Sequence, residues 1–177
     1  ARSNAELANS FGNLAQRTLS FIAKNLEGEL PFGGKEHDDD GELQAAVARG
    51  TRLELPKQFI ELNLSLGIDA WMRAVQACNQ YIDAQAPWAL RKTDPDRMIA
   101  VLATLYVCIR DLAIAIQPVI PHSAQMLLDQ MGISESERSY DSLNDALWYF
   151  RLKESGFKLA APKPIFPRLE MPAEEAA

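Results

Sequence analysis

The sequence has few of the residues that build metal centres and covalent active sites. Its 177 residues include two cysteines and two histidines, and neither His37 nor His122 has a glutamate at the Glu-x-x-His spacing of a di-iron helical bundle. The sequence also contains no glycine-rich phosphate loop and no strand-turn-helix nucleophile elbow. We therefore expect no catalytic site, no metal and no cofactor within this chain.

An excess of basic charge and long apolar runs are missing as well. The chain has 18 Lys and Arg residues against 24 Asp and Glu residues, a formal net charge of −6. Proteins that hold nucleic acid by bulk electrostatics present a basic face, and a membrane span needs ~20 apolar residues. These absences argue against a DNA-binding protein and a membrane protein, and they leave open nucleic-acid recognition through a small local patch.

The two cysteines lie in the middle of helical patterns. Cys78 and Cys108 have apolar neighbours and no CxxC spacing, which predicts buried thiols in a reducing compartment and hence a cytoplasmic protein. The chain begins at Ala1 with neither a methionine nor a targeting pattern. We interpret this start as that of a piece cut from a longer chain.

Apolar residues recur at helical spacing through most of the sequence, and 47% of the residues are apolar, enough for one substantial core. The predicted fold class is all-α, an antiparallel bundle of about five helices that occupies residues 1–150. An extended C-terminal arm follows over 151–171, where three prolines in six positions exclude a helix, and residues 172–177 are expected to be disordered. The patterns predict helices over 3–26, 43–49, 56–85, 98–116, 121–131 and 141–148.

Two stretches need a choice between interpretations. The run His37-Asp38-Asp39-Asp40 resembles a metal cluster, but Asp39 with Glu42 also fits a helix cap, so we predict a cap on a solvated surface. Apolar residues between Phe59 and Ile82 cover more than half of a helix circumference, which is typical of a helix at the centre of a bundle. Gly67 marks a position where that helix can bend.

A proline followed by a tryptophan ends the longest helical pattern. Pro87 cannot lie inside a helix, so the preceding helix should stop at about Gln85 or Ala86. Trp88 then either packs inward as a wedge or stands at the rim as a platform for an aromatic group from outside. Burial of large aromatics favours the wedge when this corner is considered alone.

Polar side chains share one face of the first predicted helix. Asn13 and Arg17 are four residues apart and therefore neighbours, and Ser20 and Lys24 continue the same face. An amide and a guanidinium fork suit hydrogen bonds to base edges, although spacing alone favours a solvated face. The basic pair Arg91-Lys92 follows Trp88 closely enough in sequence for a phosphate contact.

Three motifs together resemble the C-terminal part of the methionyl-tRNA synthetases, a family of class I aminoacyl-tRNA synthetases. The opening Asn4-Ala5-Glu6-Leu7-Ala8-Asn9 is similar to the place where that family's anticodon-binding domain begins. The motifs are Asn13-Leu14-Ala15-Gln16-Arg17, Tyr81-Ile82-Asp83-Ala84-Gln85-Ala86-Pro87-Trp88, and Pro164-Ile165-Phe166-Pro167-Arg168-Leu169-Glu170.

The resemblance implies a domain that reads the CAU anticodon loop of tRNA(Met) and carries no catalytic site. Trp88 resembles the stacking platform for the first anticodon base, Pro87 fixes its orientation, and Asn13 and Arg17 resemble the hydrogen-bonding pair. Methionine activation with ATP would belong to the parent's catalytic domain, toward which the arm returns with Phe157, Ile165 and Phe166 packed inward. The roles of Asp83 and Gln85 stay open between orienting the corner and touching RNA.

Two other functions compete with anticodon reading. A non-enzymatic helical interaction module would use Trp88 and the proline-rich arm to dock another protein. The anticodon domain of a different class I synthetase would keep RNA as the partner and change the anticodon.

Overall fold

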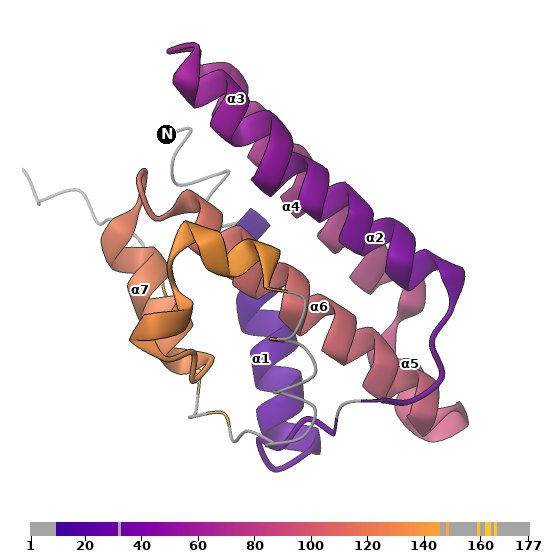
Figure 1. Cartoon of the computed structure of the whole chain (residues 1–177). Helices are drawn as coiled ribbons and strands as arrows, with labels where there is room; N and C mark the ends of the chain where they lie inside the picture. The colour runs from indigo at the N-terminus through magenta and orange to yellow at the C-terminus, as the bar shows by residue number, and fades with distance from the viewer. Residues whose placement is uncertain are drawn as a thin grey trace, which may run out of the picture.

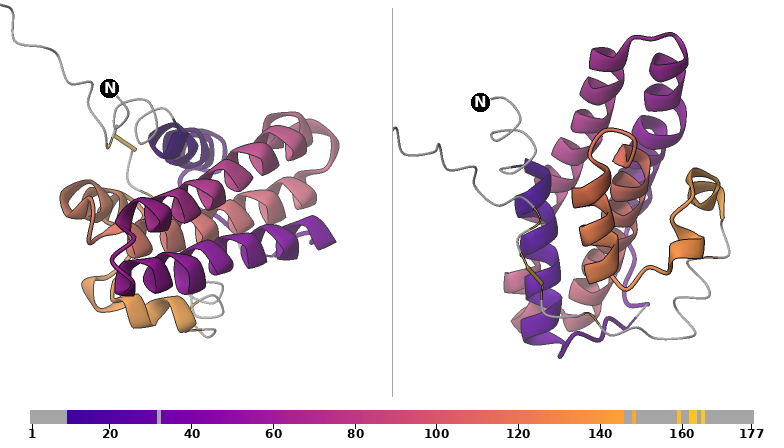
Figure 2. Two further views of the ribbon diagram at one scale, coloured as in Figure 1. Left: turned by 90° about the horizontal axis from the view of Figure 1, so that it is seen from above. Right: turned by 90° about the vertical axis from the view of Figure 1, so that its left-hand side faces the viewer.

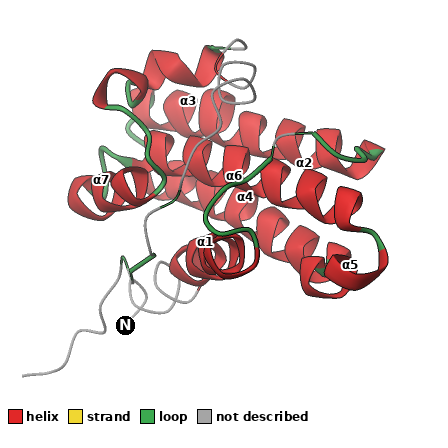
Figure 3. Ribbon diagram, turned by 90° about the horizontal axis from the view of Figure 1, so that it is seen from below, coloured by secondary structure: helices red, strands yellow, loops and turns green. Residues whose placement is uncertain are grey.

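The computed structural model describes residues 10–31, 33–145, 148, 159, 162–163 and 165, and these confirm the all-α class (Figures 1 and 3). A π-helical segment, Arg49–Glu54, joins α2 to α3, and short 3₁₀ turns cover Glu135–Glu137 and Tyr140–Asn144. The α-helices are α1 (Asn13–Asn25), α2 (Asp38–Ala48), α3 (Leu55–Ile60), α4 (Leu64–Gln85), α5 (Pro87–Thr93), α6 (Pro95–Ile116) and α7 (Pro121–Gln130).

Helix α6 is the centre of the bundle, with α2, α4, α1 and α7 around it (Figure 2). Its start follows the sequence signals, since Asp94 accepts a hydrogen bond from the Arg97 backbone N–H and Pro95 occupies the first turn. This helix is long and apolar enough to cross a membrane, but 89% of its most apolar stretch is buried among the other helices. Its apolar character therefore belongs to a bundle core. Cys78 and Cys108 are buried free thiols within that core, as predicted.

The segment predicted as one helix over 56–85 is two antiparallel helices. Helix α3 ends at Ile60, the chain turns through Leu62 in a left-handed conformation (φ 60°), and α4 begins at Leu64. Helix α2, the π-helical segment and α3 continue one another along α4 (Figure 1). The prediction was wrong because apolar residues continue through the turn without a proline or glycine to mark it. Gly67 is no bend, because it lies inside α4 where the Phe59 ring packs against its backbone.

The predicted cap of the second helix is also corrected. Helix α2 begins at Asp38 rather than at residue 43, and His37 takes the cap position, with its backbone N–H donating to Asp40 Oδ2. Asp40 is buried, so this part of the acidic run is not a solvated surface. Within the predicted helix over 141–148, residues 141–144 belong to a 3₁₀ turn, Trp148 is helical, and residues 146–147 lie outside the described part of the chain.

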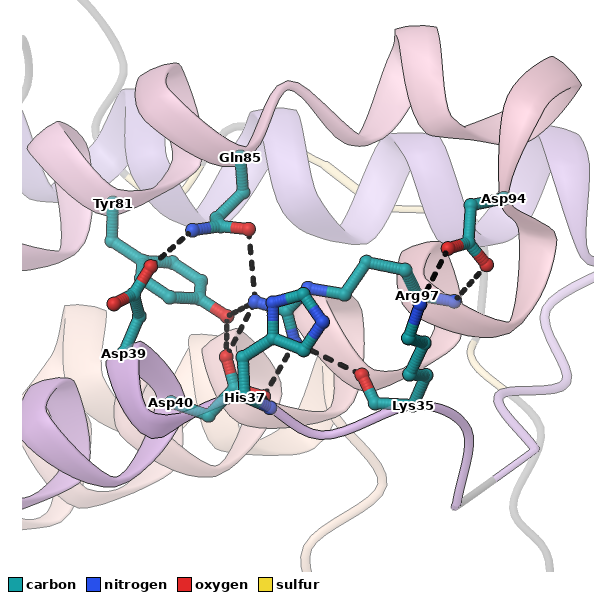
Figure 4. A network of polar contacts seen from close by, with 8 residues as sticks. All are labelled: Lys35, His37, Asp39, Asp40, Tyr81, Gln85, Asp94 and Arg97. Carbon is teal, nitrogen blue, oxygen red and sulfur yellow. Dashed lines mark hydrogen bonds and ion pairs between the residues drawn. The ribbon is translucent and has the colours of Figure 1, made fainter.

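A buried polar network joins α2, α4 and α6 beside α5 (Figure 4). The Arg97 guanidinium donates hydrogen bonds to both carboxylate oxygens of Asp40, at 2.6 and 2.7 Å, and to Gln85 Oε1 at 2.8 Å. The Tyr81 hydroxyl donates to the same carboxylate. Bidentate hydrogen bonds between a guanidinium and a carboxylate are among the stronger hydrogen bonds of proteins. The network therefore fixes the last turn of α4 relative to two neighbouring helices.

The environment of the network sets its protonation. Burial would raise the pKa of Asp40, but hydrogen bonds from Arg97 and Tyr81 outweigh it and hold that pKa below its ordinary value. Burial, together with the hydrogen bond to Asp40, raises the pKa of the Tyr81 hydroxyl. At neutral pH the carboxylate is thus ionised and the phenol is a hydrogen-bond donor.

Described residues of the C-terminal arm touch the bundle. Leu159 and Ile165 are buried, and the Leu159 backbone N–H donates to the Gly28 carbonyl at 2.8 Å. The Lys163 backbone N–H donates to the Gln130 side chain at 2.7 Å. The predictions for Phe157, Phe166 and residues 172–177 fall outside the described part of the chain.

We predict that Gly50→Ala destabilises the bundle, because a Cβ at this position would lie 3.0 Å from the Ala74 Cβ and 3.2 Å from the Ala70 carbonyl oxygen. Pushing the π-helical segment away from α4 should lower the free energy of unfolding by about 1–3 kcal/mol, as overpacking usually does. The control is Gly41→Ala in α2, where a Cβ meets open space and should add roughly 0.5–1 kcal/mol. Urea unfolding measures both, and equal effects would contradict the close contact.

A second prediction concerns the buried ion pair. Arg97→Met leaves the Asp40 carboxylate buried without its cation and should lower the free energy of unfolding by about 3–5 kcal/mol. Arg73→Met is the control, since it removes an exposed pair with Glu54 and should cost less than about 1 kcal/mol. Both are measured by urea unfolding at pH 7. A loss at Arg97 no larger than that at Arg73 would refute a structural role for the network.

Candidate functional site

The corner between α4 and α5 presents an indole at the rim of the bundle. Helix α4 ends at Gln85 as predicted, Ala86 takes a left-handed conformation (φ 44°), and Pro87 begins α5. Pro87 is buried, whereas Trp88 is 47% exposed. The left-handed residue reverses the chain, and the buried proline fixes the base of the next turn. Trp88 is thus a half-exposed plane and not an inward wedge.

Arg17 reaches Trp88 from α1. Its guanidinium carbon lies 5.4 Å from the centre of the Trp88 ring, within the range of a cation–π contact. The same guanidinium donates to Asp83 Oδ1 on α4 at 2.6 Å. Both side chains of this ion pair are exposed, so it adds little stability. Its effect is to orient Arg17 beside the indole.

A groove of about 230 Å³ lies between α1 and the corner. Apolar side chains form its floor, including those of Phe21 and Ile82, and the cations Arg17 and Lys24 lie at its edge. Such a groove offers a flat surface for an aromatic group, with hydrogen-bond donors beside it. The full lining is Arg17, Thr18, Ser20, Phe21, Lys24, Ile82, Pro87, Trp88 and Leu102.

The structure brings together three of the predicted site residues, Arg17, Pro87 and Trp88. Asn13 is exposed one turn earlier on α1, next to the groove rather than in its lining. Lys24 lines the groove, and sequence reasoning placed it on the polar face of the helix but not in the site. The sequence signal for Lys24 as a site residue was its spacing of seven residues, two helical turns, from Arg17.

The basic pair after Trp88 lies in the last turn of α5. Arg91 and Lys92 are both exposed. The Arg91 guanidinium donates to the Asn25 side chain at the end of α1, so this residue ties the two helices together. Lys92 is therefore the simpler candidate for a phosphate contact.

Asp83 and Gln85 both orient the corner. Asp83 on α4 accepts a hydrogen bond from Arg17 on α1. Gln85 donates to Asp39 at 3.0 Å and accepts from Arg97 at 2.8 Å, which connects the corner to the buried network (Figure 4). The contacts that the structure shows for both side chains are therefore within the protein.

A larger cavity, of about 540 Å³, lies between α2 and α6 and is separate from this groove. Its charged side chains bond to one another, since Asp111 accepts from Arg52 at 2.8 Å and from Arg110 at 2.9 Å. Arg110 also lies over the Trp148 ring at 3.9 Å. Within the part of the chain that the structure describes, no three His, Cys, Asp or Glu side chains gather as a metal site.

Comparison with known proteins identifies relatives along nearly the whole chain. A methionine–tRNA ligase from Rhizobium meliloti is 42% identical over 174 residues, which is 97% of this chain and 32% of that protein. The ligase from Mycobacterium bovis is 37% identical, with the same two coverages. The crystal structure of the apo form of Mycobacterium tuberculosis methionyl-tRNA synthetase matches with a TM-score of 0.85 at 33% identity, covering 97% of this chain and 34% of that one.

These matches have two consequences. The chain spans about a third of the length of its relatives. The family model for the anticodon-binding domain of methionyl-tRNA ligase matches residues 30–176, which is most of the chain. This chain belongs to the family of anticodon-binding domains of methionyl-tRNA ligases.

Proposed function

We propose that this chain recognises the CAU anticodon loop of tRNA(Met), with the first anticodon base stacked on Trp88. The observation that carries the proposal is the half-exposed indole with the Arg17 guanidinium 5.4 Å from its centre. Sequence-specific RNA recognition acts mostly on unstacked loop bases, which stack on aromatic or guanidinium planes and are hydrogen-bonded at their edges. Trp88 supplies the plane, and Arg17 and Asn13 supply the edge contacts.

The site is held ready before RNA arrives. Asp83 orients Arg17, Pro87 is buried directly before Trp88, and Gln85 ties the corner to Arg97. A surface already ordered in its binding conformation loses less entropy on association. This preorganisation supports a recognition surface over a mobile docking loop.

Local charge supports RNA as the partner despite the net charge of the chain. The exposed cations Arg17, Lys24, Arg91 and Lys92 surround the corner. Two acids near these cations are compensated within the protein, since Asp40 is paired with Arg97 and Asp83 with Arg17. Because the cations are few, they position the backbone of a loop, and base contacts supply the specificity.

The whole enzyme, on this proposal, is a cytoplasmic methionine–tRNA ligase that uses ATP. Methionine activation then takes place in the part of the protein outside this sequence, because the chain spans about a third of its relatives. A crystal structure of the Mycobacterium tuberculosis synthetase, similar with a TM-score of 0.84, is bound by methionyl-adenylate. The domain described above contributes tRNA selection to that reaction.

Trp88→Ala should weaken binding of the methionine anticodon stem-loop by about 1–3 kcal/mol, the usual contribution of one base stacked on an aromatic. Trp88→Phe keeps a stacking plane and should recover part of the affinity. The fold should survive in both variants because the indole is half exposed. Fluorescence anisotropy measures affinity and urea unfolding measures stability. Wild-type affinity in folded Trp88→Ala would remove the indole from the RNA site.

Arg17→Ala and Lys92→Ala should separate base contacts from phosphate contacts. Loss of Arg17 should weaken binding of the CAU loop more than that of loops with other anticodons, because base-edge contacts carry discrimination. Loss of Lys92 should weaken all loops alike and lower the salt slope of binding by about 1. Lys92 is a cleaner test than Arg91, which also binds Asn25. Titrations of several loops at three salt concentrations would contradict the assignment if Arg17→Ala affected every loop equally.

A further inference from the structure

The segment that leads into α2 contacts the chain on both sides of α5. We call residues 34–40 the clamp. Helix α5 carries Trp88 and lies between Gln85, the last residue of α4, and Asp94, which caps α6. The clamp bonds to both of these flanking residues, through Asp39 and Lys35 respectively (Figure 4). One short segment therefore connects the two ends of the corner, and none of its residues lines the groove.

On the α6 side, the clamp is held through its backbone. The Lys35 N–H donates to the Asp96 carbonyl at 3.2 Å, and the Lys35 carbonyl accepts from the Arg97 guanidinium at 3.2 Å. The Lys35 ammonium also forms an exposed ion pair with Asp94 at 3.7 Å. Gly34 (φ 90°) lies so close to α6 that a Cβ there would be 2.2 Å from the Asp96 carbonyl oxygen. Only glycine permits this approach, which fixes the clamp against the first turn of α6.

On the α4 side, the clamp is held through side chains. Gln85 Nε2 donates to Asp39 Oδ2 at 3.0 Å, and Gln85 Oε1 accepts from Arg97 at 2.8 Å. An ionised Asp39 offers only acceptors and Arg97 only donors, so one orientation of the Gln85 amide satisfies both partners. The next residue is Ala86, whose left-handed conformation (φ 44°) is unfavourable for a residue with a Cβ. The amide thus holds the chain directly before its reversal into α5.

The charges of the clamp argue against a direct contact with RNA. Three of its exposed side chains, Glu36, Asp38 and Asp39, are carboxylates, which repel phosphate. Any contribution of the clamp to RNA binding therefore acts through the protein, by way of the residues that it contacts around α5.

We propose that the clamp positions α5 for anticodon recognition, with Asp39 and Gln85 as positioning residues. This inference rests on the proposed function, because it takes Trp88 to stack on a base of the loop. Bonds on both sides of α5 restrict where the indole can lie. Without the bond between Asp39 and Gln85, the corner would have to be ordered when RNA binds, and that ordering reduces affinity.

Two alanine variants of the intact parent ligase separate positioning from charge. Asp39→Ala and Asp38→Ala each remove one carboxylate from the first turn of α2, and of the two only Asp39 bonds to the corner in the described part of the chain. Asp38→Ala should leave binding of the methionine anticodon stem-loop unchanged or slightly tighter, because it lowers the negative charge. Asp39→Ala should weaken binding by about threefold to tenfold, the range of one ordinary hydrogen bond. Fluorescence anisotropy measures both variants, and equal effects would overturn the proposal.

An exchanged pair tests the same bond without removing it. Gln85→Glu places a second carboxylate against Asp39 and should weaken binding of the loop. Gln85→Glu combined with Asp39→Asn reverses donor and acceptor, keeps an acceptor for Arg97 and has the wild-type net charge. This double variant should return to wild-type affinity. Binding no tighter than that of Gln85→Glu alone would overturn the proposal, whatever the alanine variants show.

Two further measurements distinguish positioning from general damage. The salt slope of binding should be the same in Asp39→Ala as in the wild type, because no phosphate contact is lost. Methionine-dependent ATP–pyrophosphate exchange should also be unchanged, since that reaction does not use the corner. A parallel fall in exchange activity would identify general damage and overturn the positioning role. Failure of the wild-type ligase to bind the loop would instead refute the proposed function.

Discussion

The buried ion pair between Arg97 and Asp40 is the interaction on which the functional end of the bundle depends. Removing two charges from water is expensive, so such a pair is stable only when further hydrogen bonds satisfy its remaining donors and acceptors. Tyr81, Gln85 and the Lys35 carbonyl supply most of those bonds, and the Arg97 Nε–H is left without a partner in the described part of the chain. The consequence is that α2, α4 and α6 are fixed beside the corner without burial of Trp88. The indole can remain at the surface because the corner does not need it as a wedge.

Helix α4 connects this corner to the other exposed surface of the domain. A continuous helix of 22 residues is a stiff element, and its middle packs on the core through Trp71, Val75 and Cys78. Its two ends differ in chemistry, with aliphatic side chains at the α3 turn and an aromatic–cation pair at the α5 turn. Movement of one end relative to the other would require the core to repack, which close-packed interiors resist. The position of the corner is therefore tied to that of the α3 turn at the other end of α4.

The parts of the fold that were predictable from the sequence depend on local backbone chemistry. Pro87 marked the end of α4, Pro118 and Pro121 marked the break between α6 and α7, and Gly132 (φ 70°) marked the end of α7. Each of these residues restricts or relaxes the backbone at its own position, so its effect is visible in the sequence. The turn at Leu62 was missed because it carries no such residue. Pairing of Asp40 with Arg97 was missed as well, since the two are 57 positions apart and no local pattern joins them. No local pattern joins Arg17 to Trp88 either, so spacing alone favoured a solvated face for Arg17 and a buried wedge for Trp88. The resemblance to the synthetases was what pointed to the two residues together.

A domain with a net charge of −6 cannot rely on general attraction to phosphate. On the proposed function, its few cations near the corner give weak binding to any RNA, which leaves a larger share of the binding energy to stacking on Trp88 and to hydrogen bonds from Arg17. Those contacts depend on which base occupies the groove, whereas phosphate contacts do not. An acidic scaffold thus favours discrimination over affinity, because a non-cognate loop gains little from the charge of the rest of the surface. Selectivity of this kind requires an oriented guanidinium, and Asp83 provides that orientation at the expense of one positive charge.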